Sequence, residues 1–172
     1  MTLIELQDSL PDYARDLKLN LQTVLAQAEL TEQQTWTVAT TCALASRNPK
    51  LSETIVTEAA ARLSPAQLSS AKAAFAIMGM NNIFYRFRHF VSGGEYDQIP
   101  ARLRMQSIRN HGGDPIDFEL ACLAVSTING CEACVISHAA VVREKGLSAE
   151  TVVASVRIAS TLHAVASILE AC

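Results

Sequence analysis

The sequence has little of what marks disordered chains, β-rich folds or nucleic-acid-binding surfaces. Of its 172 residues only 7 are glycine and 5 are proline, aromatic residues make up 5%, and charged residues make up 18% against 49% apolar residues. This composition excludes a disordered or low-complexity chain. The net charge of −3 argues against nucleic acid as a partner, because surfaces that bind it are basic. No uninterrupted apolar run reaches the roughly 18 to 20 residues of a membrane span, so we expect no membrane partner.

Cysteine is also scarce. Five cysteines are an odd number and too few for a disulfide-rich scaffold of this length. The N-terminal segment carries acidic residues early and has no basic stretch followed by an apolar core, so we expect no signal peptide and a cytoplasmic location. In a reducing compartment, two closely spaced cysteines indicate redox or metal chemistry rather than a structural bridge.

The pattern that is present is helical. Apolar residues recur at three- and four-residue steps through most of the chain, which predicts a single all-α domain over residues 1–172 with an N-terminal helical extension. The interruption lies between Val91 and Pro115, where glycine and proline gather. We interpret that stretch as a connector with one short helix, Ala101 to Arg109.

The chain also contains a possible internal repeat. Leu63-Ser64 and Leu147-Ser148 each precede an expected helix, and aligning them brings two sets of three expected helices into register. The first set is 31–47, 51–62 and 64–90, and the second is 115–129, 131–145 and 148–170. A three-helix unit cannot cover its own apolar faces, whereas two packed copies can. We therefore expect repeat halves of about 31–90 and 115–172. Helices that are apolar on several faces predict either a deep core or a subunit interface.

The segment with most chemical information is the one that follows Gly130. Cys131 and Cys134 lie three residues apart at an expected helix start, so their sulfurs share one face and can form a disulfide. The positive end of the helix dipole favours thiolate over thiol. His138 follows Cys134 by one turn and can exchange a proton with it. We expect this pair to occupy an exposed corner of the molecule.

Two other interpretations of these cysteines compete with the redox one. They could be buried residues that act as small hydrophobic side chains. They could also bind zinc, but Cys131, Cys134 and His138 supply three ligands where a structural site needs four, so we expect no metal. The remaining cysteines are expected to be two core thiols and a frayed terminal one: Cys42, Cys122 and Cys172.

Glu119 is a further candidate because it interrupts an otherwise apolar helix. A charge there is costly unless it is paired or used. It either faces solvent in the first helical turn, where a carboxylate is favoured, or lies partly buried beside His138 and shares a proton with it. His111, in the glycine-rich connector, is interpreted as a loop residue, and His89 and His163 have no partner that the sequence identifies.

The run from Asp117-Phe118-Glu119-Leu120 through Ser126 and Asn129-Gly130-Cys131 to Cys134 and His138 resembles the AhpD alkyl hydroperoxidase family. That family belongs to the carboxymuconolactone decarboxylase-like superfamily, and the resemblance extends over nearly the whole chain. It implies an all-α subunit in a ring-like homo-oligomer, a trimer or a multiple of it. It also implies a thiol peroxidase and disulfide reductase without a bound cofactor, which takes electrons from dihydrolipoamide on a lipoylated acyltransferase protein and passes them to the peroxiredoxin AhpC.

The resemblance also assigns roles to individual residues. Cys134 looks like the sulfur that attacks the hydroperoxide, Cys131 like the proton donor and resolving thiol, and Glu119 with His138 like the proton relay. Some members carry a histidine where this chain has Ala133, so dithiol–disulfide exchange is the firmer expectation here and direct peroxidase activity the weaker one.

Two alternatives stay open. A cofactor-free carboxymuconolactone decarboxylase would not need the cysteine pair. A redox-sensing interaction subunit would form the disulfide without rapid turnover.

Overall fold

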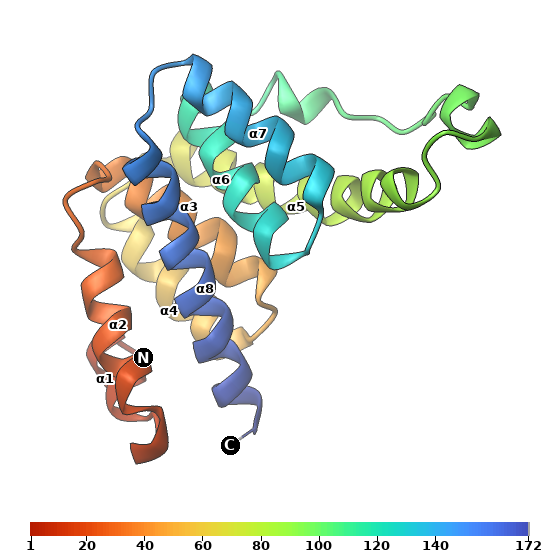
Figure 1. The fold of residues 1–172 in the computed structure, drawn as a ribbon. Helices are drawn as coiled ribbons and strands as arrows, with labels where there is room; N and C mark the ends of the chain where they lie inside the picture. Colours follow the sequence, from red (N-terminus) through yellow and green to blue (C-terminus); the bar gives the residue numbers. More distant parts are fainter. Residues whose placement is uncertain (172) are drawn as a thin grey trace.

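The computed structural model describes residues 1–171 and is all-helical over that range, as predicted. Its α-helices are α1 Leu3–Asp8, α2 Arg15–Leu25, α3 Glu32–Ala45, α4 Pro49–Ala60, α5 Pro65–Phe90, α6 Pro115–Ile128, α7 Glu132–Glu144 and α8 Ala149–Ala171. Three short 3-10 helices complete the order: η1 Asp12–Ala14, η2 Glu95–Gln98 and η3 Gln106–Ile108. Both ends of the chain lie at the same end of the bundle (Figure 1).

Side-chain caps set where these helices begin. Thr31 and Ser64 each accept from the backbone three residues on, and glutamines at those positions bond back, which completes a capping box at each helix start. Asp114 caps α6, with its side chain accepting from two backbone N–H groups. Asn48 caps α4, which therefore begins at Pro49, slightly before the expected position. Local sequence thus fixes the helix starts.

Helices α3 and α6 form the centre of the molecule. They pack against each other, and each also contacts α5 and α8 (Figure 1). Nearly every side chain of α6 from Phe118 to Ser126 is buried. Burial of one large apolar side chain, such as leucine, valine or phenylalanine, stabilises the folded state by about 1.5–3 kcal/mol, so the core holds α6 firmly. This matters for the site because α6 carries Glu119 and leads directly to Cys131.

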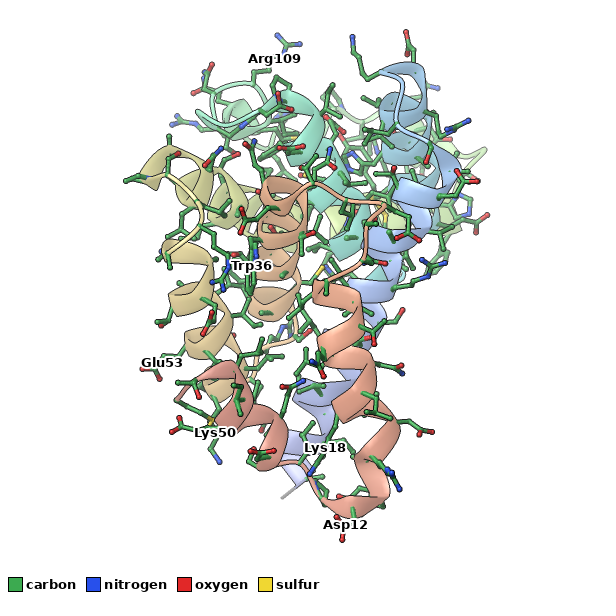
Figure 2. All side chains as sticks on the ribbon, turned by 90° about the vertical axis from the view of Figure 1, so that its left-hand side faces the viewer. Asp12, Lys18, Trp36, Lys50, Glu53 and Arg109 are labelled. Carbon is green, nitrogen blue, oxygen red and sulfur yellow. A yellow bond between two sulfur atoms is a disulfide. The ribbon has the colours of Figure 1, made fainter. Side chains whose placement is uncertain are left out.

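The outer helices complete the bundle. The N-terminal extension packs α1 on α4 and α2 on α8. Figure 2 shows Lys50 and Glu53 on the outer side of the bundle and Trp36 among the helices. The Trp36 ring is 6% exposed, and the Arg62 guanidinium lies 4.4 Å from its centroid. The predicted repeat halves correspond to α3–α5 and α6–α8, and the repeat itself stays a prediction.

The connector differs from its prediction. The expected helix Ala101 to Arg109 was wrong, because only the three residues of η3 are helical there and residues 101–105 are irregular. Arg102 has a φ of 51°, in the left-handed region, which no α-helix accommodates. The connector extends from the end of α5, away from the bundle, and returns to α6 (Figure 1).

Helix α8 also corrects an expectation. By length and mean hydropathy, 1.7, it could cross a membrane, although no stretch of the chain was expected to qualify. The prediction considered only uninterrupted apolar runs. Helix α8 has none of sufficient length, because Arg157 and several small polar residues interrupt its apolar residues. One such helix is weak evidence, because a core helix passes the same test. The buried side chains of α8 do lie in the core, against α2, α3 and α6.

Candidate functional site

The cysteine pair lies where the tight turn after α6 leads into α7, with Cys131 as the last residue before α7 and Cys134 in its first turn. Gly130 has a φ of 64°, a left-handed conformation that glycine adopts without strain, and it turns the chain at the end of α6. The backbone N–H of Cys131 then donates to the Ser126 carbonyl at 3.0 Å, and Cys131 precedes the first residue of α7. Cys131 and Cys134 form a disulfide with their Cα atoms 5.3 Å apart. The predicted placement of both sulfurs on one face of a helix start is therefore confirmed.

The two sulfurs differ in access. Cys131 is fully buried and Cys134 is 6% exposed, so the expected exposed corner was wrong. The reason is that α5 packs on α7 and η3 packs on α5, which covers the start of α7. Cys134 nevertheless lines a pocket of about 350 Å³, and Cys131 does not. A reactant that enters the pocket therefore meets Cys134 and not Cys131.

The pocket lining is mainly apolar with a few polar groups. Its large apolar side chains come from α5 and the connector, and are Met78, Tyr85, Met105 and Ile108. The Tyr85 hydroxyl donates to the Met105 sulfur at 3.8 Å, which ties the connector to α5. The polar side chains of the lining are Asn81 from α5 and Ser137 and His138 from α7. An organic molecule with one small polar head suits such a lining.

His138 is held by Glu119. The imidazole Nδ1 lies 2.6 Å from Glu119 Oε2, and the two side chains are 15% and 21% exposed. Of the two positions considered for Glu119, the structure therefore shows the partly buried one beside His138. The carboxylate engages Nδ1, which leaves Nε2 as the nitrogen free to exchange protons with the pocket.

A buried amide network holds the turn that precedes Cys131. Asn82 on α5 donates to Ser126 Oγ at 2.8 Å and accepts from the Asn129 side chain at 2.9 Å. Arg86, one turn further along α5, donates to the Asn129 carbonyl at 2.6 Å. This network was not predicted from the sequence. The available signal was the pair Asn81-Asn82 inside a largely apolar helix.

His111 and His89 do not line the pocket of Cys134 and have partners elsewhere. His111 is in the loop, as expected, where its Nδ1 lies 2.8 Å from Ser70 Oγ and accepts from the Gly113 N–H at 3.2 Å. Its ring stacks on Phe118 with centroids 4.0 Å apart. Burial lowers the pKa of His111. His89 pairs with the exposed Glu132 at 3.3 Å.

The remaining ionisable groups do not extend the site. Cys42 and Cys122 are buried free thiols, as expected, and burial raises the pKa of both. Cys172 lies outside the described residues. Within residues 1–171 no cluster of three or more histidine, cysteine, aspartate or glutamate side chains could hold a metal ion. The chemistry that the arrangement offers is thus that of a dithiol beside a carboxylate-held imidazole.

Comparison with known proteins points to the same chemistry. The carboxymuconolactone decarboxylase family model matches residues 94–172, which include the pair and both relay residues. A protein of Solibacter usitatus named alkyl hydroperoxide reductase AhpD is 59% identical over 170 residues, which cover 99% of this chain and 96% of that protein. Proteins with the same name are 52% identical in Gluconacetobacter diazotrophicus and 48% identical in Acidobacterium capsulatum, covering 99% of this chain and 93% and 94% of theirs.

Proposed function

The chain belongs to the AhpD family of alkyl hydroperoxide reductases, and on that premise we propose that its Cys131–Cys134 pair reduces organic hydroperoxides and disulfides. The observation that carries the proposal is the unequal access of the two sulfurs. One lines a pocket that also holds a carboxylate-bound imidazole, and the other lies fully buried behind it. This is the arrangement expected of an attacking thiol and a resolving thiol.

In the first step Cys134 reacts as a thiolate. His138 takes the thiol proton at Nε2, and the Glu119 carboxylate stabilises the imidazolium that forms. The Cys134 sulfur attacks the terminal oxygen of the hydroperoxide and the O–O bond breaks. The departing alkoxide takes the proton from His138, which leaves an alcohol and a sulfenic acid on Cys134.

In the second step Cys131 resolves the sulfenic acid. Its thiol sulfur attacks the sulfur of Cys134, and the hydroxyl of the sulfenic acid leaves as water with the thiol proton. The product is the disulfide that the structure contains. Two electrons have passed from the dithiol to the hydroperoxide.

A dithiol reductant returns the pair to its starting state. One thiolate of dihydrolipoamide attacks the accessible Cys134 sulfur and releases Cys131, and its second thiol then closes the lipoyl disulfide and releases Cys134. The apolar wall of the pocket suits the hydrocarbon arm of a lipoyl group. We propose a lipoylated acyltransferase protein as the donor, the peroxiredoxin AhpC as the disulfide substrate, and the cytoplasm as the location.

Exposed apolar side chains support assembly into a homo-oligomer, a trimer or a multiple of it. They gather on the last turns of α5 and on the connector: Ile83, Phe87, Phe90, Tyr96, Ile99 and Leu103. An apolar patch of this kind marks a protein interface more often than a free surface.

The test is steady-state reduction of tert-butyl hydroperoxide with dihydrolipoamide as electron donor. Cys131→Ser and Cys134→Ser should each abolish turnover and leave the fold intact. The matched control is Cys42→Ala, which removes a buried thiol that does not line the pocket of Cys134 and should keep turnover. Full activity in either site variant would overturn the assignment.

The matched family model favours one other candidate, a cofactor-free lactone decarboxylase. Such an enzyme has no use for the cysteine pair. Titration of thiols before and after addition of hydroperoxide separates the two, because the proposed reaction removes two thiols per chain. A slow redox sensor would lose the same thiols, and only steady-state turnover distinguishes it from the enzyme.

A further inference from the structure

Two polar side chains of α5 hold the turn that leads to Cys131. Asn82, which is fully buried, bonds both ends of the turn, because it donates to Ser126 Oγ and accepts from the Asn129 side chain. Arg86 lies one turn further along α5, is partly buried, and donates to the backbone carbonyl of Asn129 at 2.6 Å. The turn between α6 and α7 is thus tied to a third helix.

These bonds add to what the turn needs for its own shape. The backbone already closes the end of α6, because Gly130 is left-handed and the Cys131 N–H donates to the Ser126 carbonyl at 3.0 Å. Such backbone bonds shape the turn but do not fix its place relative to α5, whose side chains line the pocket beside Cys134. Cys131 precedes α7, so the position of its sulfur depends on the turn as well as on the helix. The contact from Arg86 therefore holds the segment that carries this sulfur.

We propose that Arg86 is a positioning residue for the resolving thiol, which keeps the Cys131 sulfur within reach of Cys134 while the disulfide is open. The inference rests on the proposed function, in which the Cys131 thiol attacks the sulfenic acid on Cys134. That attack requires the two sulfurs at bonding distance and in the right orientation, and a turn that moves freely spends less time in this geometry. Arg86 does not line the pocket of Cys134, so its effect passes through the Asn129 carbonyl.

The contact suits an arginine. The Asn129 carbonyl lies at the C-terminal end of α6, where the helix dipole favours a cation. A hydrogen bond from a charged donor is also stronger than a neutral one, and the planar guanidinium holds its donors in a fixed geometry. Arg86→Gln removes the charge and shortens the side chain, so it breaks this bond and keeps a polar group at the position. Arg86→Lys keeps the charge and should restore most of the hold.

The first experiment sets closure of the disulfide against capture of the sulfenic acid. The reduced protein, with both cysteines present, receives one equivalent of tert-butyl hydroperoxide together with dimedone, whose carbon bonds to the sulfenic sulfur of Cys134 with loss of water. The ratio of dimedone adduct to disulfide then reports how fast Cys131 closes the bond. In Arg86→Gln this ratio should rise about tenfold, on the order of one lost charge-assisted hydrogen bond. The rate at which hydroperoxide oxidises Cys134 should change by less than about twofold, and Arg86→Lys should bring the ratio to within about threefold of wild type.

Arg88→Gln is the matched control. Arg88 is also a partly buried arginine of α5 that donates to backbone carbonyls, but these lie in the connector, among them that of Tyr96 at 3.3 Å. This variant should keep the ratio of adduct to disulfide within about twofold of wild type, because the connector does not carry Cys131. A merely structural role for Arg86 predicts a lower thermal unfolding midpoint in both glutamine variants and an equal ratio in both, and that result would overturn the inference.

A redox titration against dithiothreitol tests the same claim without a hydroperoxide. A freer turn lowers the effective concentration of Cys131 at Cys134, so the disulfide of Arg86→Gln should be reduced about tenfold more easily, which is a midpoint potential about 30 mV less negative. If the wild-type protein reacts with the hydroperoxide and Arg86→Gln changes neither the ratio nor the midpoint, the inference is wrong and the proposed function stands. If the wild-type protein does not react with the hydroperoxide, the proposed function fails. A shifted midpoint then supports the positioning of Cys131, and an unchanged one overturns it.

Discussion

Replacement of Glu119 by glutamine tests the proton relay, because it removes the charge behind His138 and keeps the side-chain shape. In the structure Oε2 of Glu119 lies 2.6 Å from the imidazole Nδ1, and both side chains are largely buried. When His138 becomes imidazolium, a charge-assisted hydrogen bond stabilises it by about 1.5–3 kcal/mol, against about 0.5–1.5 kcal/mol for a neutral one. The difference, about 1–2 kcal/mol, predicts that Glu119→Gln slows attack on the hydroperoxide roughly 5- to 30-fold.

The assay is the second-order rate at which tert-butyl hydroperoxide oxidises the reduced dithiol, followed by quenched thiol titration over a range of pH. The matched control is Glu132→Gln, because that carboxylate also pairs with a histidine, at 3.3 Å, but is 69% exposed. Solvent screens such a pair, so the control should stay within about twofold of wild type. Unchanged rates and an unchanged pH profile in Glu119→Gln would refute the relay.

Three further predictions address the scaffold and the pocket. In a denaturant titration, Gly113→Ala should lower the free energy of unfolding by about 1–3 kcal/mol, because its Cβ would lie 2.6 Å from Ser70. The same titration of Gly79→Ala, whose Cβ would lie in open space on α5, should show a rise of about 0.5–1 kcal/mol. Burial lowers the pKa of His111 below its ordinary value of 6.5. As the pH drops through 6.5, His111 binds a proton more readily in the unfolded chain than in the folded one, so the free energy of unfolding should fall. Denaturant titrations should show this fall weakened in His111→Gln. Ala133→Phe should fill the pocket and slow both the oxidation of the dithiol by hydroperoxide and the reduction of the disulfide by dithiothreitol. Rates equal to those of the wild-type protein would show that reactants do not enter there.

The fold was predictable where local signals decide it. Helical periodicity identified all the long helices, and their starts at Thr31, Ser64 and Asp114 follow from caps that depend only on residues two or three apart. The connector was not predictable in this way. The backbone of Arg102 is in the left-handed region, which interrupts the short expected helix, and no neighbouring residue in the sequence predicts that conformation.

The site was predictable to the extent that it lies on one helix. Cys134 and His138 lie one turn apart on α7 and Cys131 directly precedes that helix, so spacing alone placed them together. The contact of Glu119 with His138 depends on how α6 packs on α7, and periodicity does not give that geometry. The burial of the cysteines was missed for the same reason, because the cover comes from α5 and the connector.

The central claim is that the accessible sulfur attacks and the buried one resolves. The direct measurement is trapping of a sulfenic acid with dimedone in the two single-cysteine variants after one equivalent of tert-butyl hydroperoxide, with the adduct located by mass spectrometry. We expect an adduct on Cys134 in the Cys131→Ser protein and none on Cys131 in the Cys134→Ser protein. An adduct on Cys131, or none on Cys134, would contradict it.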